Sequence, residues 1–167
     1  MFKKSKPMHE VYSCPFPPKL PEDGQGMPTD DALLEERLPK LAYAFAPEFI
    51  VCEDCVFVAD FLYHYGGTTP DTIEKTVRQL KKRLHGNVRE AEMTVNSWSV
   101  EDALSNFGVI LLGGERISDA GIQYLAEAMA YFWRLRCAAL FPDRNIKVEL
   151  GYDIMGEYGL TITVYQV

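Results

Sequence analysis

Apolar residues recur at helical spacing between positions 70 and 85. The apolar stripe consists of Ile73, Val77, Leu80 and Leu84. Thr69 is a suitable N-cap, Pro70 fits the first helical position, and Gly86 can end the helix. The pattern therefore predicts an amphipathic helix over residues 70–85, with its lysines and arginines lying off the apolar stripe.

The most apolar stretch of the chain follows Ser118 and ends near Pro142. The charged residues in its interior are Glu127, Arg134 and Arg136. A helix that is apolar on nearly all sides is normally buried in the core of a protein. We therefore expect a long, central, buried helix over about residues 118–140.

Strict alternation of apolar and polar residues marks the C-terminal part of the chain. Residues 146–150 and 160–164 both alternate cleanly, which predicts two antiparallel strands joined by residues 151–158. Because the second strand would build the C-terminus into a sheet, we expect removal of residues 160–167 to unfold the domain.

Two shorter strands are predicted in the middle of the chain. In segment 90–98, Ala91, Met93 and Val95 would face inward, and Glu92, Thr94 and Asn96 would face outward. The continuous apolar run 107–112 is typical of a strand covered on both faces. Between these strands, Ser99 followed by Glu101 and Asp102 can open a short helical turn.

The segment 49–65 combines both kinds of pattern. Phe49–Cys52 has the composition of a strand, whereas Cys55–Tyr65 fits either a strand or a helix stopped at Gly66. We expect a strand followed by a helix. Residues 29–38 and 41–45 predict two short helical segments before it.

Together these elements predict an α+β fold. We expect one domain over residues 29–167, in which a mostly antiparallel sheet of about four or five strands packs on the buried helix 118–140, with the amphipathic helix 70–85 beside it. Residues 1–28 hold six of the ten prolines. This composition predicts a proline-rich extended arm, either lying across the domain or forming a flexible tail.

Length and composition describe an ordinary globular protein. The chain has 167 residues, 47% of them hydrophobic, and a formal net charge of −7. That charge disfavours nucleic acid and anionic membrane as partners. The basic N-terminus is not followed by an apolar signal region, and no apolar stretch is long enough to span a bilayer. We therefore expect a cytoplasmic protein with free thiols.

Charge is sorted along the sequence. Residues 29–60 carry eight acids against two bases, and residues 69–89 carry six bases against two acids. Blocks of opposite sign create fields that steer partners. They can also attract each other within one molecule, which would weaken the external field.

The motifs that carry chemistry in other proteins are incomplete here. Cys52 and Cys55 have the spacing of a metal or redox pair, but no second such pair is present, and the two acids between them disfavour a thiolate. The three histidines are scattered, and no nucleophile elbow, phosphate loop or dinucleotide fingerprint occurs. The sequence therefore predicts no metal and no cofactor.

The segment 151–159 is the most unusual loop. It combines Tyr152, Met155 and Tyr158 with the acids Asp153 and Glu157. Tyrosine and a flexible methionine beside a few acids suit a contact surface for another protein. The two carboxylates could instead form an acid–base pair, or the segment could be a plain hairpin loop.

These observations favour a non-enzymatic protein-binding domain: an acidic inhibitor or immunity-type protein that neutralises a toxin or another protein with a basic site. Two alternatives stay open. One is a small hydrolase or transferase around His64, Asp153 and Glu157, and the other is a homodimer or larger homo-oligomer. The residues predicted to bind the partner are Asp30, Asp31, Glu35, Glu36, Glu53, Asp54, Tyr152, Asp153, Met155, Glu157 and Tyr158.

Overall fold

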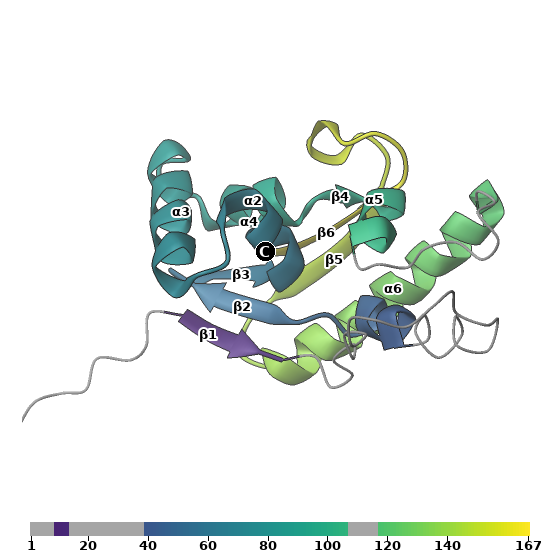
Figure 1. Cartoon of the computed structure of the whole chain (residues 1–167), viewed down its shortest axis with the longest axis horizontal. Coiled ribbons are helices and arrows are strands. Elements are labelled where there is room, and N and C mark those ends of the chain that lie inside the picture. Colours follow the sequence, from purple (N-terminus) through teal and green to yellow (C-terminus); the bar gives the residue numbers. More distant parts are fainter. Residues whose placement is uncertain (1–8, 14–38, 107–116) are drawn as a thin grey trace, which may run out of the picture.

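The computed structural model describes residues 9–13, 39–106 and 117–167, which form an α+β fold (Figure 1). The strands are β1 (His9–Tyr12), β2 (Phe49–Cys52), β3 (Cys55–Val58), β4 (Trp98–Ser99), β5 (Ile146–Gly151) and β6 (Thr161–Gln166). The helices are α2 (Ala59–Gly66), α3 (Pro70–Arg83), α4 (Val88–Asn96), α5 (Val100–Asn106) and α6 (Asp119–Leu140), with a short 3-10 turn, η2 (Ile154–Gly156). The predicted fold class is confirmed.

The strands form two small sheets rather than the single expected sheet. Both are antiparallel and three-stranded, in the orders β1-β2-β3 and β4-β6-β5. The predicted C-terminal strand pair is confirmed, because β5 pairs with β6 from Ile146 opposite Gln166 to Gly151 opposite Thr161. The helix predicted over 29–38 and the strand predicted over 107–112 lie outside the described residues. Residues 39–45 are helical, in agreement with the turn expected over 41–45.

The helix predicted over 70–85 is confirmed as α3. The Thr69 hydroxyl accepts from the Thr72 backbone N–H, and Pro70 occupies the first helical position. Gly86 follows the helix with a φ of +81°, a conformation that glycine adopts without strain. The apolar stripe is buried at Ile73, Val77 and Leu80.

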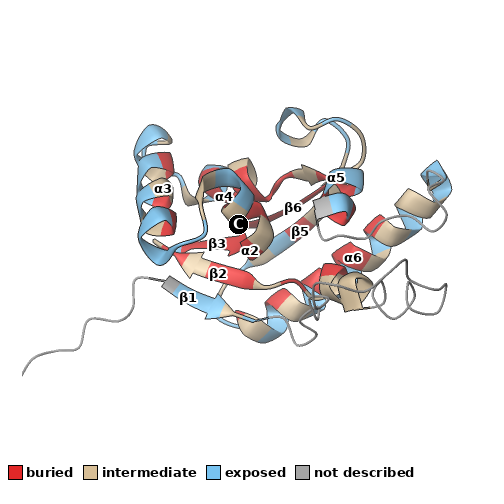
Figure 2. Ribbon diagram, viewed as in Figure 1, coloured by how far each residue is buried: buried red, intermediate tan, exposed pale blue. Residues whose placement is uncertain are grey.

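The long helix α6 is confirmed in position but is not buried on all sides. Its buried residues are Ala126, Met129, Ala130, Trp133 and Cys137. The opposite side exposes Tyr124, Tyr131 and Leu135 within the described structure (Figure 2). The helix lies across one side of the sheets, so only one of its faces meets them (Figure 1). Apolar composition alone could not reveal this, because both faces carry apolar residues.

The strand predicted over 90–98 is wrong, because most of this segment is the helix α4. The Asn87 side chain caps it by accepting from the Glu90 backbone N–H at 3.1 Å. Its buried residues are Ala91, Glu92, Val95 and Asn96, which share one helical face. Over so few residues, period 2 and period 3.6 fit the apolar positions equally well. The helix is distinguished from a strand by its buried polar residues, Glu92 and Asn96, which lie on the same face as Ala91 and Val95.

Glu92 and Asn96 connect the two sheets. The Glu92 carboxylate accepts from the backbone N–H of Val56 in β3 and of Gln166 in β6, both at 2.6 Å. The Asn96 amide donates to the carbonyls of Val56 and Val164 at 2.8 and 2.9 Å, and its oxygen accepts from the Val58 N–H at 3.0 Å. The side chains of Glu92 and Asn96 thus pair backbone N–H and C=O groups of β3 and β6 that would otherwise need a neighbouring strand as their hydrogen-bond partner.

The hairpin β2–β3 replaces the helix expected to start near Cys55. Its turn consists of Glu53 and Asp54, whose φ values of 52° and 70° match the type I′ turn favoured in two-residue hairpins. The predicted helix then begins four residues later as α2 and ends before Gly67, whose φ is +109°. The order of strand and helix was therefore right, but the strand content was underestimated.

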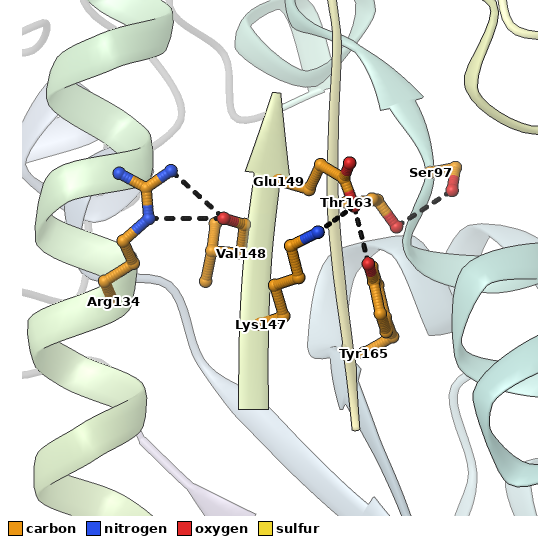
Figure 3. A network of polar contacts seen from close by, with 7 residues as sticks. All are labelled: Ser97, Arg134, Lys147, Val148, Glu149, Thr163 and Tyr165. Atoms are coloured by element: carbon orange, nitrogen blue, oxygen red, sulfur yellow. Dashed lines mark hydrogen bonds and ion pairs between the residues drawn. The ribbon is translucent and has the colours of Figure 1, made fainter. Parts of the chain in front are cut away.

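Polar side-chain contacts of the β4-β6-β5 sheet help to hold β5 and β6 in register (Figure 3). The Tyr165 hydroxyl donates to Glu149 at 2.5 Å, and the Lys147 ammonium lies 3.0 Å from the same carboxylate. The hydrogen bond from Tyr165, together with Lys147, lowers the pKa of Glu149. On the α6 side, the Arg134 guanidinium donates twice to the Val148 carbonyl.

Candidate functional site

The segment between β5 and β6 forms a loop that stands away from the rest of the domain (Figure 1). It includes η2 and presents Tyr152, Met155 and Tyr158 to solvent, with 69%, 48% and 93% of their surfaces exposed. Asp153 is also exposed, and Glu157 is half-buried. We call residues 151–160 the tyrosine loop. The structure brings these five predicted residues together in it.

The backbone of the tyrosine loop adopts an unusual conformation. Asp153 and Met155 have φ values of 60° and 55°, and Gly156 and Gly159 have values of 80° and 83°. Asp tolerates the left-handed region, but a methionine there costs roughly 1–2 kcal/mol. Strained residues of this kind cluster at functional sites, where a particular shape matters more than stability.

A hollow of about 270 Å³ lies where the tyrosine loop meets the beginnings of α5 and α6. We call it the loop hollow. Its lining residues are Ser99, Glu101, Asp119, Ile122, Gln123, Tyr152, Tyr158, Gly159 and Leu160. The Val100 N–H donates to the Leu160 carbonyl at 2.8 Å, which fixes α5 against the base of the loop. The lining combines the apolar residues Ile122 and Leu160 with two tyrosines and two acids.

A second cleft, of about 440 Å³, contains His64. We call it the histidine cleft, and its lining residues are His64, Trp98, Asp102, Ser105 and Glu157. The His64 ring meets Trp98 edge to face at 5.1 Å, and Phe61 stacks on the same indole at 4.7 Å. Two of the three residues proposed for a hydrolase site therefore share this cleft, whereas Asp153 does not line it.

The chemistry of the histidine cleft is limited by the role of Asp102. Its carboxylate accepts from the Ser99 hydroxyl at 2.7 Å, and the same hydroxyl accepts from the Asp102 backbone N–H. Asp102 thus belongs to the cap of α5 and is directed to Ser99 rather than to His64. In a catalytic triad, the carboxylate is hydrogen-bonded to the imidazole and the imidazole is hydrogen-bonded to the nucleophile, so Asp102 does not occupy the carboxylate position of a triad with His64.

Acidic side chains are shared by the described linings of both concavities. The loop hollow and the histidine cleft are lined by Glu101, Asp102, Asp119 and Glu157, and no lysine or arginine of the described chain is among their lining residues. The sequence showed Glu101, Asp102 and Asp119 only as acids at helix starts, where the helix dipole explains them. Their meeting beside the tyrosine loop depends on tertiary structure.

The other six acids predicted to bind the partner are not part of the tyrosine loop. Asp30, Asp31, Glu35 and Glu36 lie outside the described residues. Glu53 accepts from Arg78 of α3 at 2.8 Å, and its carbonyl accepts from Lys81 at 2.6 Å. The Asp54 carbonyl accepts from Arg144 and from Gln166, at the end of β6 remote from the tyrosine loop. Part of the acidic block therefore meets the basic helix within the molecule.

The cysteine pair is structural in character. Cys52 and Cys55 face each other across the β2–β3 hairpin and are fully buried. Burial raises their pKa values to about 11 and about 12. Thiols of this kind are poor nucleophiles and poor metal ligands at neutral pH. Within the described ranges, no group of three histidine, cysteine or acidic side chains could hold a metal.

A half-buried pair of acids, Glu48 and Asp60, lies near the start of α2. The Tyr43 hydroxyl donates to Asp60, and Tyr63 donates to Glu48. Burial raises the pKa of both carboxyls, and the nearby Asp60 charge raises that of Glu48 further. Because each acid already has a tyrosine partner, this cluster connects helix 39–45 to α2.

No helix among the residues that the structure describes is long and apolar enough to cross a membrane. No protein-family model, no curated protein and no solved structure matches the chain.

Proposed function

We propose that this chain is a non-enzymatic protein-binding domain that uses the tyrosine loop and the neighbouring acids to occupy a basic site on another protein. In its most concrete form it is a cytoplasmic inhibitor or immunity-type protein. The observation that carries the proposal is the exposure of Tyr152, Met155 and Tyr158 on a loop held in a strained conformation.

The composition of this surface supports binding rather than chemistry. Tyrosine is enriched among the residues that dominate binding energies, and methionine adapts to the shape of a partner. The acids around the loop hollow would select a basic partner and speed its association. The buried free thiols Cys52, Cys55 and Cys137 suit a reducing compartment.

Affinity capture from the native host, or co-expression with the product of a neighbouring gene, tests the proposal. The captured protein is identified, and its binding is measured at low and high salt. We expect the double variant Tyr152→Ser and Tyr158→Ser to lose the partner. The control is Tyr131→Ser, which removes an exposed tyrosine from the middle of α6 and should bind like the unmodified protein. Equal binding by all three proteins would refute the role of the loop.

The histidine cleft supports a second candidate function, a small hydrolase or transferase. The observation in its favour is that His64, Ser105 and Glu157 line one concavity. A panel of ester, amide, phosphoester and glycoside substrates should show turnover that His64→Ala abolishes and His85→Ala preserves. His85 is an exposed histidine at the end of α3 and is the matched control.

The third candidate is a homo-oligomer in which the acidic side of one copy meets the basic face of α3 in another. That face exposes Lys75, Arg78, Lys82 and Arg83. Sedimentation at low and high salt tests it directly. Self-association that disappears with salt would favour this candidate over the other two.

A further inference from the structure

We infer that the loop hollow is an anchor site for one lysine or arginine side chain of the protein partner. This inference rests on the proposed function and deepens it, since it states which chemical group of the partner enters the domain. It is carried by the shape and lining of the hollow rather than by the number of acids around it.

Two apolar lining residues of the loop hollow suit the aliphatic part of a long basic side chain. Ile122 of α6 and Leu160 at the base of the tyrosine loop contribute apolar surface to the lining. Lysine and arginine bury their methylene stems on such surfaces while their charged ends stay near polar groups. A short polar side chain would leave these two apolar residues uncovered.

The aromatic and acidic lining residues of the loop hollow suit a cationic end group. Tyr152 and Tyr158 line the hollow, and a tyrosine ring attracts an ammonium or guanidinium ion that lies over its face. Glu101 and Asp119 add carboxylates from two different helices, and Gln123 adds an amide. Aromatic rings and carboxylates converging on one concavity are the combination that recognises a cation.

An anionic group fits the loop hollow poorly, although α6 begins there. The start of a helix attracts anions through its unpaired backbone N–H groups. Here the Ser118 hydroxyl accepts from the Gly121 N–H at 3.2 Å, and Asp119 occupies the first turn. A phosphate or carboxylate would therefore meet a capped helix end and negative charge.

The exposure of the surrounding loop points to a side chain of a protein. Tyr158 is 93% exposed and Met155 is 48% exposed, so both can cover a partner surface once its basic side chain is seated. A partner held only by charge would not require apolar residues in the lining.

The experiment uses the full chain and three pentapeptides of the form acetyl-Gly-Gly-Xaa-Gly-Gly-amide. Xaa is lysine, arginine or norleucine, which has an aliphatic stem without a charge. Binding is measured by NMR titration, with the tyrosine ring signals followed directly. We expect the lysine and arginine peptides to shift the Tyr152 and Tyr158 signals, and norleucine to bind at least about tenfold more weakly.

Variants locate the site. Tyr158→Ala should weaken the binding of the basic peptides about two- to fivefold, the range expected for one exposed cation–π contact. Glu101→Gln and Asp119→Asn should also weaken it and reduce its dependence on salt. Tyr131→Ala is the matched control and should bind normally. Thermal melting confirms that each variant is folded.

The outcome separates this inference from the proposed function. Equal binding of norleucine and lysine peptides, or normal binding by Tyr158→Ala, Glu101→Gln and Asp119→Asn alike, overturns the anchor site. The proposed function survives that result if a captured partner still depends on Tyr152 and Tyr158. If basic peptides bind in the hollow but capture yields no loop-dependent partner, the anchor site is supported and the proposed function fails.

Discussion

Replacing Glu92 with alanine should destabilise the domain strongly, although the change improves intrinsic helix propensity. Glu92 is fully buried in α4. Its carboxylate accepts from the Val56 and Gln166 backbone N–H groups and from the Gln166 side chain, all at 2.6 Å. The alanine variant leaves those donors without their acceptor.

The magnitude follows from opposing contributions. A buried backbone N–H that loses its acceptor costs about 1–3 kcal/mol, which applies to Val56. The half-buried Gln166 N–H costs less, because water can reach it. The missing side chain also leaves a void, which adds to the cost. Removing a buried carboxylate returns part of its desolvation penalty. We therefore expect Glu92→Ala to lower the free energy of unfolding by about 2–4 kcal/mol.

Urea denaturation followed by circular dichroism measures this change. The control is Glu90→Ala, which removes an exposed first-turn acid and its hydrogen bond from Asn87 in the same helix and should lower the free energy of unfolding by less than about 1 kcal/mol. A Glu92→Ala variant as stable as the control would refute the idea that α4 satisfies the edges of both sheets.

The pH dependence of stability provides a second readout on the same residue. Burial raises the pKa of Glu92 above its ordinary value of 4.5, so the folded state holds this proton to higher pH than the unfolded state does. Its contribution to stability is therefore present at low pH and decreases as pH rises through the raised pKa. Glu92→Gln should remove this part of the slope. An unchanged slope in stability measured from about pH 4.5 upward would contradict the assignment.

Three further predictions concern other parts of the fold. Met155→Gly should raise the free energy of unfolding by up to about 1 kcal/mol, because glycine tolerates the φ of 55°, and partner binding should weaken; a loss of stability in urea would contradict this. In a Cys14→Ser background, a thiol reagent at pH 8 should label Cys52 and Cys55 only after denaturation, because burial raises both pKa values; rapid labelling of the folded protein would refute their burial. Deletion of residues 160–167 removes the central strand β6 and should abolish cooperative thermal unfolding, whereas a truncated chain that melts cooperatively would contradict its central position.

The sequence was most informative where local signals agreed. Thr69, Pro70 and the apolar stripe specify α3 without reference to the rest of the chain, and the alternation in 146–150 and 160–164 specifies a strand pair. The prediction of a strand over 90–98 was wrong because the buried face of α4 contains Glu92 and Asn96. Polar residues are normally placed outside, and only their distant partners in β3 and β6 explain why they lie inside.

Part of the candidate site could also be predicted from the sequence, and part could not. The tyrosine loop was visible in the sequence, since Tyr152, Met155 and Tyr158 occupy a short connection between two clear strands. Glu101 and Asp119 were not, because they lie 18 residues apart and each has a local explanation at a helix start. Their convergence on the loop hollow depends on how α5 and α6 pack.

The positions of the charged groups have a consequence for kinetics. The acids beside the tyrosine loop lie at the opposite end of the molecule from the exposed bases of α3 (Figure 1). This separation of charge among the described residues contributes a dipole, and the field of the proposed basic partner would turn the molecule so that the loop arrives first. Productive encounters then become more frequent without any stronger contact. Salt should accordingly slow the association rate of the complex while leaving its lifetime nearly unchanged.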